Sequence, residues 1–333
     1  MTVSSSSFLE IRTTPQAGRS YYSTTALAEN TRVLDISTPY TYTIYKQFRN
    51  EVCSECFKYD GGRRNFLTCR EHSETAGLSF CVALCRDTWL AREGSEAVEM
   101  LTRLEGTRKK GKQKLEDESE GLTLGTEEDI GRGWDDVRRD ENNGKTLRKW
   151  RKLLLDEYQA DVARYALLAL HHLFQEKSSR PSEDKGDGSL NYGGSDWGLF
   201  SSLQDSEITR VKQIPALLED HIIIYQVLKG LFTSDSRRGE TEGSGTVFGD
   251  IITIENVRKT LGVDAGNSFG IWERPLIENS ELLGFAVYPV PSFFNHGACA
   301  DQTGLQKRLI GCFFAKIAPR ISKARGRVGS YGS

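Results

Sequence analysis

The chain has no apolar run long enough to cross a bilayer and no marked excess of charge of either sign. Its longest apolar stretches, at 166–170 and 222–224, fall far short of the roughly 20 residues of a membrane helix. Lysine and arginine number 44 against 46 aspartates and glutamates, for a formal net charge of -2. Such a balance gives no general attraction to nucleic acid or to an anionic membrane surface. We therefore expect neither a membrane protein nor a general nucleic-acid-binding protein.

The N-terminal sequence lacks the cationic start and apolar segment of a secretory signal. Cysteine is scarce, with 7 among 333 residues, of which five lie between Cys53 and Cys85. An odd number with this clustering does not suit a disulfide framework in a chain of this size. We expect a protein of the nucleus or the cytoplasm rather than a secreted one. The hydrophobic content of 38% and charged content of 27% are ordinary for one large or two modest domains.

Four of the cysteines form two closely spaced pairs, Cys53 with Cys56 and Cys81 with Cys85. Two short-spaced pairs of thiolate ligands can close a tetrahedral Zn²⁺ site around a small loop. We predict one structural zinc ion held by all four, with no open position for water or substrate. The alternative is a set of four buried free thiols.

Periodicity and turn residues predict short strands on either side of a helical middle. The first 45 residues mix β-rich runs with turn residues, and strands are expected again after residue 268. Apolar residues at three- and four-residue spacing predict a helix over 150–175. The charged stretch 103–149 is expected to be a loop or a disordered insertion.

Two further helices are indicated by their boundaries. One helical region is expected over 206–232, with an interruption near Pro215. Thr253 has the side chain of an N-cap, and Gly262 is expected to close the short helix that Thr253 begins.

Three short motifs carry the functional signal. Gly18-Arg19 opens a β-rich run, Asn-Ser-Phe-Gly occupies 267–270, and Pro-Ser-Phe-Phe-Asn-His occupies 291–296. In this order the motifs resemble those of SET-and-MYND (SMYD-like) lysine methyltransferases. The fungal-type branch with one retained zinc ion is the most similar.

The cysteine region resembles a MYND zinc finger, whose central element Phe80-Cys81-x3-Cys85 matches. A second zinc ion in that family needs further cysteine and histidine pairs. Only Cys69 and His72 lie between the two pairs here. We interpret them as incidental polar residues, which keeps the prediction at one zinc ion.

The resemblance implies an α+β chain with the SET fold: small, mostly antiparallel β-sheets and a pseudoknotted C-terminal segment, with an inserted zinc module and a helical insertion. It divides the chain into five parts. These are an N-terminal SET half (1–52), a MYND-like zinc module (53–92), a charged linker with the helical insertion (93–249), a C-terminal SET half (250–321) and a basic tail expected to be disordered (322–333).

The resemblance also implies a site for S-adenosylmethionine and a channel for the substrate lysine. Phe269 would border the channel. Methyl transfer from a sulfonium to an amine is an in-line displacement, so such a site positions its reactants rather than supplying a nucleophile. Taken alone, a phenylalanine such as Phe269 is more often a core residue, and His296 more often a structural histidine. The implied cofactor-binding residues are Gly18, Arg19, Asn267, Ser292, Asn295 and His296.

The C-terminal end departs from the family pattern. No intact Gly-Glu-Glu-Leu-x-x-Ser-Tyr-like segment carries a catalytic tyrosine, and Ser-Tyr-Gly at 330–332 is the candidate replacement, with Tyr331 as the catalytic residue. The sequence favours a protein-lysine N-methyltransferase of weak activity, with histones as one candidate substrate class. The alternative is an inactive SET-fold adaptor whose zinc module and charged insertion bind protein partners.

Overall fold

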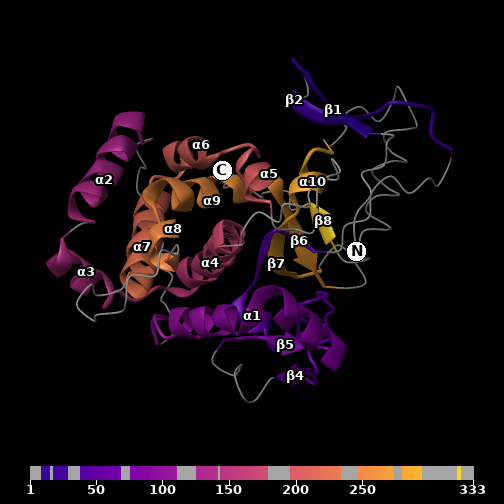
Figure 1. Ribbon diagram of the computed structural model, residues 1–333, viewed down its shortest axis with the longest axis horizontal. Coiled ribbons are helices and arrows are strands. Elements are labelled where there is room, and N and C mark those ends of the chain that lie inside the picture. The colour runs from indigo at the N-terminus through magenta and orange to yellow at the C-terminus, as the bar shows by residue number, and fades with distance from the viewer. Residues whose placement is uncertain are drawn as a thin grey trace, which may run out of the picture.

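The computed structural model combines small β-sheets with a larger helical part (Figure 1). No helix among its described residues is both long and apolar enough to cross a membrane. The described residues are 9–15, 18–28, 38–68, 76–110, 125–141, 143–178, 196–233, 247–273, 280–294 and 321–323.

All strand pairs in the described parts are antiparallel, and they form three small sheets. The largest has the order β3-β7-β6-β8, so segments from both ends of the chain meet in one sheet. This arrangement agrees with the expected α+β class. The strands are β1 (Leu9–Thr14) with β2 (Gly18–Ser23), β4 (Leu67–Thr68) with β5 (Ser79–Phe80), and β3 (Thr41–Ile44), β6 (Ser268–Trp272), β7 (Leu282–Val287) and β8 (Ile321–Lys323).

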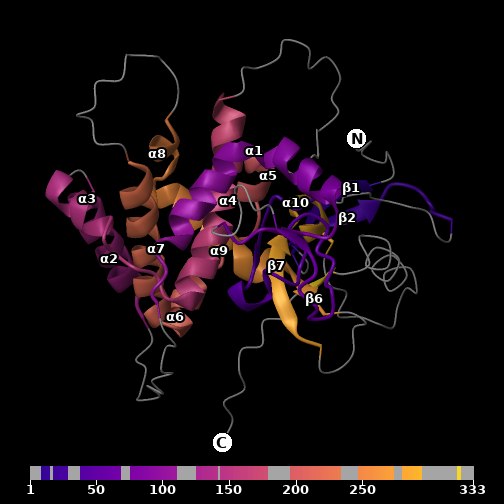
Figure 2. The same ribbon diagram turned by 90° about the horizontal axis from the view of Figure 1, so that it is seen from below.

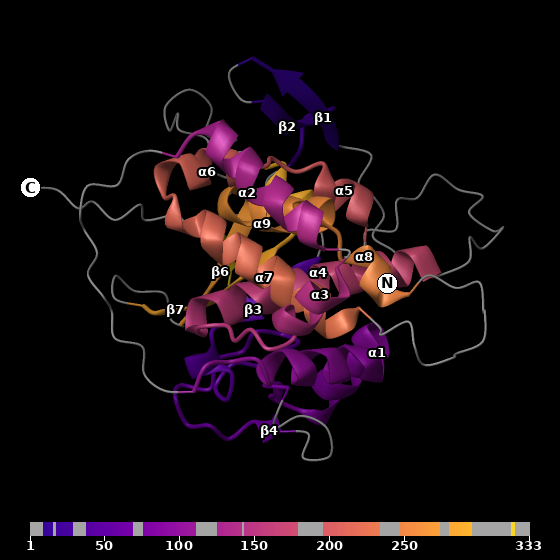
Figure 3. The ribbon, with the colours of Figure 1, turned by 90° about the vertical axis from the view of Figure 1, so that its left-hand side faces the viewer.

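Helix α4 (Glu157–Ser178) is the centre of the molecule, because every residue from 159 to 173 is buried. It packs on β3 and on helices α1, α7 and α9. Figure 2 and Figure 3 show the other helices arranged around it. They are α1 (Ala83–Glu105), α2 (Glu127–Asp140), α3 (Gly144–Trp150), α5 (Trp197–Ser201), α6 (Glu207–Gln213), α7 (Ala216–Phe232), α8 (Phe248–Ile251), α9 (Ile254–Asn267), α10 (Pro289–Ser292) and the 3-10 helix η1 (Lys46–Phe48).

The prediction of a loop over 103–149 is wrong for its second half, which forms α2 and α3. The capping box of Thr126 and Asp129 begins α2. Its otherwise polar sequence has only a narrow apolar stripe, and that stripe is buried and packs in the helical layer. The stripe consists of Ile130, Trp134 and Val137.

Three helix boundaries also test the sequence analysis. The predicted break at Pro215 is confirmed, since it separates α6 from α7. The helix expected over 150–175 instead begins at Glu157, after α3 has ended at Trp150. Thr253 caps α9 as predicted, with its Oγ1 accepting from an amide 3.2 Å away.

Gly262 does not end helix α9, which continues to Asn267. The glycine instead permits a close approach, because a Cβ at this position would lie 2.0 Å from Oδ1 of Asp205. The amide of Ser206 also donates to the carbonyl of Gly262 at 2.9 Å. Gly262 therefore allows two segments to pack closely and does not terminate the helix.

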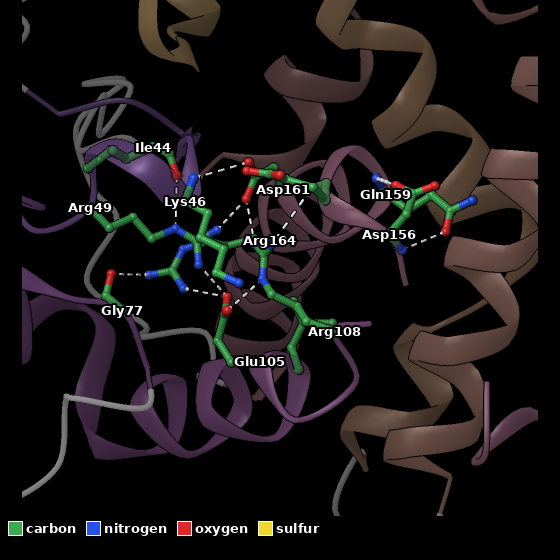
Figure 4. A network of polar contacts seen from close by, with 12 residues as sticks. Ile44, Lys46, Arg49, Gly77, Glu105, Arg108, Asp156, Gln159, Asp161 and Arg164 are labelled. Atoms are coloured by element: carbon green, nitrogen blue, oxygen red, sulfur yellow. Dashed lines mark hydrogen bonds and ion pairs between the residues drawn. The ribbon is translucent and has the colours of Figure 1, made fainter. Parts of the chain in front are cut away.

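A buried ionic network joins η1 and the end of α1 to α4 (Figure 4). Asp161 binds Arg49 and Arg108, each at 2.5 Å, and Glu105 binds the same two arginines at 2.5 and 2.6 Å. Arg164 adds a longer contact of 3.4 Å to Glu105. Three buried guanidinium groups thus share two carboxylates, and each carboxylate has to hold more than one of them in place.

Candidate metal centre and cofactor-binding site

The four cysteines predicted as zinc ligands converge in the structure. Their Sγ atoms all lie within 4.8 Å of one another. The sulfur atoms of Cys56 and Cys81 are 3.6 Å apart, and so are those of Cys81 and Cys85. Zn–S bonds of about 2.3 Å in a tetrahedron put the sulfurs roughly 3.8 Å apart. This spacing, together with the soft thiolate donor set, suggests a zinc site, and Cys53 completes the four ligands.

Backbone hydrogen bonds hold the first cysteine pair in a tight turn. The amide of Cys53 donates to the carbonyl of Lys58 at 2.9 Å, and the amide of Phe57 donates back to Cys53 at 3.0 Å. Phe57 adopts a positive φ of 55°, which closes the turn. Ser54 then pairs with Ser79, its amide donating at 2.7 Å to the Ser79 carbonyl. This last contact brings the first pair beside the second.

Neighbouring thiols shift the pKa values of Cys56 and Cys85 in opposite directions. The hydrogen bond from the Cys53 thiol lowers the pKa of Cys56 to about 5. Burial and the neighbouring Cys81 thiol raise the pKa of Cys85 to about 12. Four thiols this close cannot all ionise without a compensating cation, and a bound Zn²⁺ supplies that compensation. Cys69 and His72 lie outside the described residues.

The predicted cofactor-binding residues come from three segments that meet at one corner of the fold. The amide of Tyr21 on β2 donates to the carbonyl of Phe293 at 3.1 Å, which ties β2 to the end of α10. The Arg19 guanidinium lies 5.1 Å from the ring centroid of Phe293 and donates to the carbonyl of Ser202. Ser292, the residue before Phe293, in turn contacts Asn267. We call Gly18, Arg19, Asn267 and Ser292 the cofactor corner, after the role that the sequence resemblance predicts for them.

Asn267 and Ser292 contact each other, but their donors are already engaged. The Ser292 hydroxyl lies 3.2 Å from the Asn267 carbonyl and 2.8 Å from that of Tyr288. Nδ2 of Asn267 donates to the carbonyls of Gln204 and Val263, at 2.9 and 2.7 Å. Any further ligand of Asn267 would therefore be bound through Oδ1 or the backbone.

Gly18 is required for its backbone rather than for space. Its φ is +62°, while a Cβ there would meet nothing within 4 Å. Glycine adopts this left-handed conformation without the steric cost paid by other residues. A glycine at the start of β2 is therefore explained by the left-handed backbone conformation that the chain adopts there.

Phe269 is buried, with 4% of its surface exposed, and its ring meets that of Tyr288 edge-on at 5.7 Å. The hydroxyl of Tyr288 has no hydrogen-bond partner among the described residues. Phe269 thus packs in the core at the start of β6. The other predicted site residues, Asn295, His296 and Tyr331, lie outside the described residues.

The groups that hold Arg19 could not be identified from the sequence. Phe293 stands inside the Pro-Ser-Phe-Phe-Asn-His motif and stacks under the guanidinium, while Ser202 follows the short helix α5. An arginine and an aromatic residue in separate motifs are a weak signal for cation-π packing. The Ser202 contact uses a backbone carbonyl, which every residue has, so the side chain at that position does not predict the contact.

No family model matches the chain. A curated yeast protein does resemble it. "Potential protein lysine methyltransferase SET6" of Saccharomyces cerevisiae is 26% identical to this chain, over 91% of this chain and 82% of the yeast protein. The similarity extends over most of both proteins and is not confined to one motif. The chain is thus a distant homologue of a potential SET-domain lysine methyltransferase.

Proposed function

We propose that the chain is an S-adenosylmethionine-dependent protein-lysine N-methyltransferase of the SET-and-MYND type with one structural zinc ion. The observation that carries the proposal is the cofactor corner, where Ser292 contacts Asn267 and the next residue, Phe293, packs against Arg19, although the three segments are far apart in sequence. The distant homology to a potential lysine methyltransferase supports the same function. Protein lysines would be the substrates, and histone tails are the first class to try.

The residues of the corner suit the positioning that methyl transfer needs. S-adenosylmethionine, when bound, supplies an activated methyl group. Arg19 offers a cation whose orientation is restrained by Phe293 and Ser202. Phe269 and Tyr331 would border the substrate lysine, whose amine has a pKa of about 10.4 in water and loses its proton more readily in an apolar channel.

A second function, that of an inactive adaptor, is favoured by the hydrogen bonds of the corner. The donors of Asn267 and Ser292 are used within the chain. The C-terminal sequence also lacks an intact catalytic segment. An adaptor would keep the zinc module for binding proteins and would show no methyl transfer.

Measuring S-adenosylmethionine binding tests whether the predicted cofactor site is functional. We expect the purified chain to bind S-adenosylmethionine in calorimetric titration. The variant Asn295→Ala should bind roughly tenfold or more weakly, because a hydrogen bond to a charged ligand contributes about 1.5–3 kcal/mol. The control Asn143→Ala removes the cap of α3 and should leave affinity unchanged. Equal affinity of Asn295→Ala and the parent chain would contradict the pocket assignment.

Methyl transfer should be weak, because the catalytic tyrosine has no intact family segment around it. An acceptor misplaced by about 1 Å can cost roughly a hundredfold in rate. We expect slow radiolabel transfer to a histone mixture and its loss in Tyr331→Phe. Transfer that survives this substitution would exclude Tyr331 as the catalytic residue. Cofactor binding without any transfer would support the adaptor.

A further inference from the structure

A line of alternating charges runs from the cysteine cluster to the central helix. Glu55, which lies between Cys53 and Cys56, receives two hydrogen bonds from Arg92, at 2.8 and 3.0 Å. Nε of Arg92 also donates to Glu93 at 2.8 Å. The other carboxylate oxygen of Glu93 lies 2.7 Å from Nε2 of His172 on α4. We call Glu55, Arg92, Glu93 and His172 the charge relay.

The partners of His172 require a protonated ring. Nδ1 lies 2.5 Å from the carbonyl of Tyr40, which can only accept a hydrogen bond. Nε2 faces Glu93, and Arg92 keeps that carboxylate ionised by its own bond. A neutral imidazole has a single N–H and would leave one nitrogen lone pair facing an acceptor. Both ring nitrogens therefore donate, and the relay is electrically neutral only with His172 as a cation.

The far end of the relay reaches the core beneath the cofactor corner. Tyr40 stacks on Phe200 at 4.5 Å, and its amide donates to the carbonyl of Val287 at 2.8 Å. Tyr40, Phe200 and Phe293 belong to one buried cluster. Phe293 in turn carries the guanidinium of Arg19. A shift at Tyr40 would thus be transmitted to the packing under that arginine.

The near end of the relay lies on the segments that carry the four cysteines. Gly94, with φ of 78°, breaks α1 directly after Glu93. The part of the helix before the break carries both Cys85 and the two relay residues Arg92 and Glu93. Since Glu55 lies inside the first cysteine pair, two sides of the relay are fixed by segments that supply thiolates.

We propose that protonated His172 is a positioning residue that couples the metal centre to the cofactor corner. Loss of its proton, or of the metal at the other end, loosens the contact between residues 83–93 and α4. Coupling between two sites is reciprocal, so ligand at the corner would slow metal release as much as metal strengthens ligand binding. The cofactor end of this inference rests on the proposed function, whereas the metal end does not.

The charges around His172 fix the sign of the pH dependence. Burial alone would lower the pKa of His172, but the Glu93 carboxylate raises it above its ordinary value. A raised folded pKa gives stabilisation that is complete below about pH 6.5, the ordinary value, and is lost as pH rises through the folded value. The other charged or titratable groups that act on the ring or contact it are Arg92 on α1, His171 on α4 and Tyr40. Glu96 acts on His171, and Glu176 and Asp196 act on Tyr40.

The test compares zinc release from His172→Gln and from the parent chain, using a chromogenic chelator, from pH 6 to pH 9. Thiolate protonation affects both proteins alike and cancels in the ratio of their rates. We expect the variant to release zinc about 5 to 100 times faster at pH 6, the usual range of coupling, and the ratio to approach one at high pH. His171→Gln is the control, because burial lowers the pKa of His171 and its ratio should not vary with pH. A flat ratio for His172→Gln would overturn the proposal.

Two further measurements cover the remaining outcomes. If the variant does not fold, the proposal is tested by amide hydrogen exchange in the parent chain at several pH values, with each rate corrected for the intrinsic exchange rate at that pH. Protection of amides 83–93 should fall as an NMR titration shows His172 losing its proton, and unchanged protection would refute the relay. Calorimetry of zinc-loaded and zinc-free protein then tests the cofactor end. A chain that binds no S-adenosylmethionine would refute the proposed function and leave the zinc-release result standing.

Discussion

Cys81→Ser is expected to abolish zinc binding and to unfold the segments around the cysteine cluster. Its Sγ lies 3.6 Å from those of both Cys56 and Cys85, so its loss leaves the remaining ligands without their common neighbour. Structural zinc contributes about 10–16 kcal/mol to the folding of isolated zinc-finger peptides. We expect elemental analysis to find one zinc ion per parent chain and none in the variant, and limited proteolysis to cut first between residues 53 and 93.

Cys299→Ser is the matched control, because it removes a thiol that is not predicted to bind metal. It should keep one zinc ion and the protease resistance of the parent chain. Two zinc ions in the parent chain would instead implicate Cys69 and His72 in a second site. A parent chain without zinc would favour the alternative of four free thiols.

The cysteine cluster could be predicted from sequence because the geometry of each pair is local. Two and three intervening residues within a cysteine pair bring two thiols to one side of a turn, whatever surrounds them. What the spacing could not provide is the contact between the pairs, which depends on Ser54 and Ser79. The convergence of the four sulfur atoms confirms that the pairs belong together.

The cofactor role of the corner residues was predicted only through a resemblance, and it stays a prediction. Arg19 and Phe293 have no periodic or local signal that pairs them, and the backbone bond between Tyr21 and Phe293 brings their segments together. The internal bonds of Asn267 were equally invisible, because Gln204 contributes only a carbonyl. Long-range contacts of this kind depend on the whole fold rather than on residue type.

Buried charge was the main feature that the sequence concealed. Charged residues in an amphipathic pattern are normally assigned to the solvent face of a helix. Helix α4 contradicts that assumption, since Asp161 and Arg164 are buried beside apolar neighbours. Their partners Arg49, Glu105 and Arg108 come from separate segments and could not be paired in advance.

Asp161→Ala is expected to be among the most destabilising single substitutions in the described part of the chain. Oδ1 accepts from Arg49 and Arg108, and Oδ2 accepts from the amide of Lys46 at 3.2 Å. Burial and the neighbouring Arg164 already lower the pKa of Arg49 to about 10, so the site is short of negative charge. Removing one partner of a buried ion pair costs about 3–5 kcal/mol, against a total stability of about 5–15 kcal/mol for a typical domain.

Urea unfolding followed by circular dichroism would measure this loss as a lower midpoint. Asp136→Ala is the control, because its partner Arg139 and the carboxylate are both more than half exposed. An exposed pair on one helix contributes little, so its midpoint should barely change. Similar midpoints for the two variants would mean that solvent compensates Arg49 and Arg108 after Asp161 is removed. In that case the network would not be what holds the segments of Arg49 and Arg108 against α4.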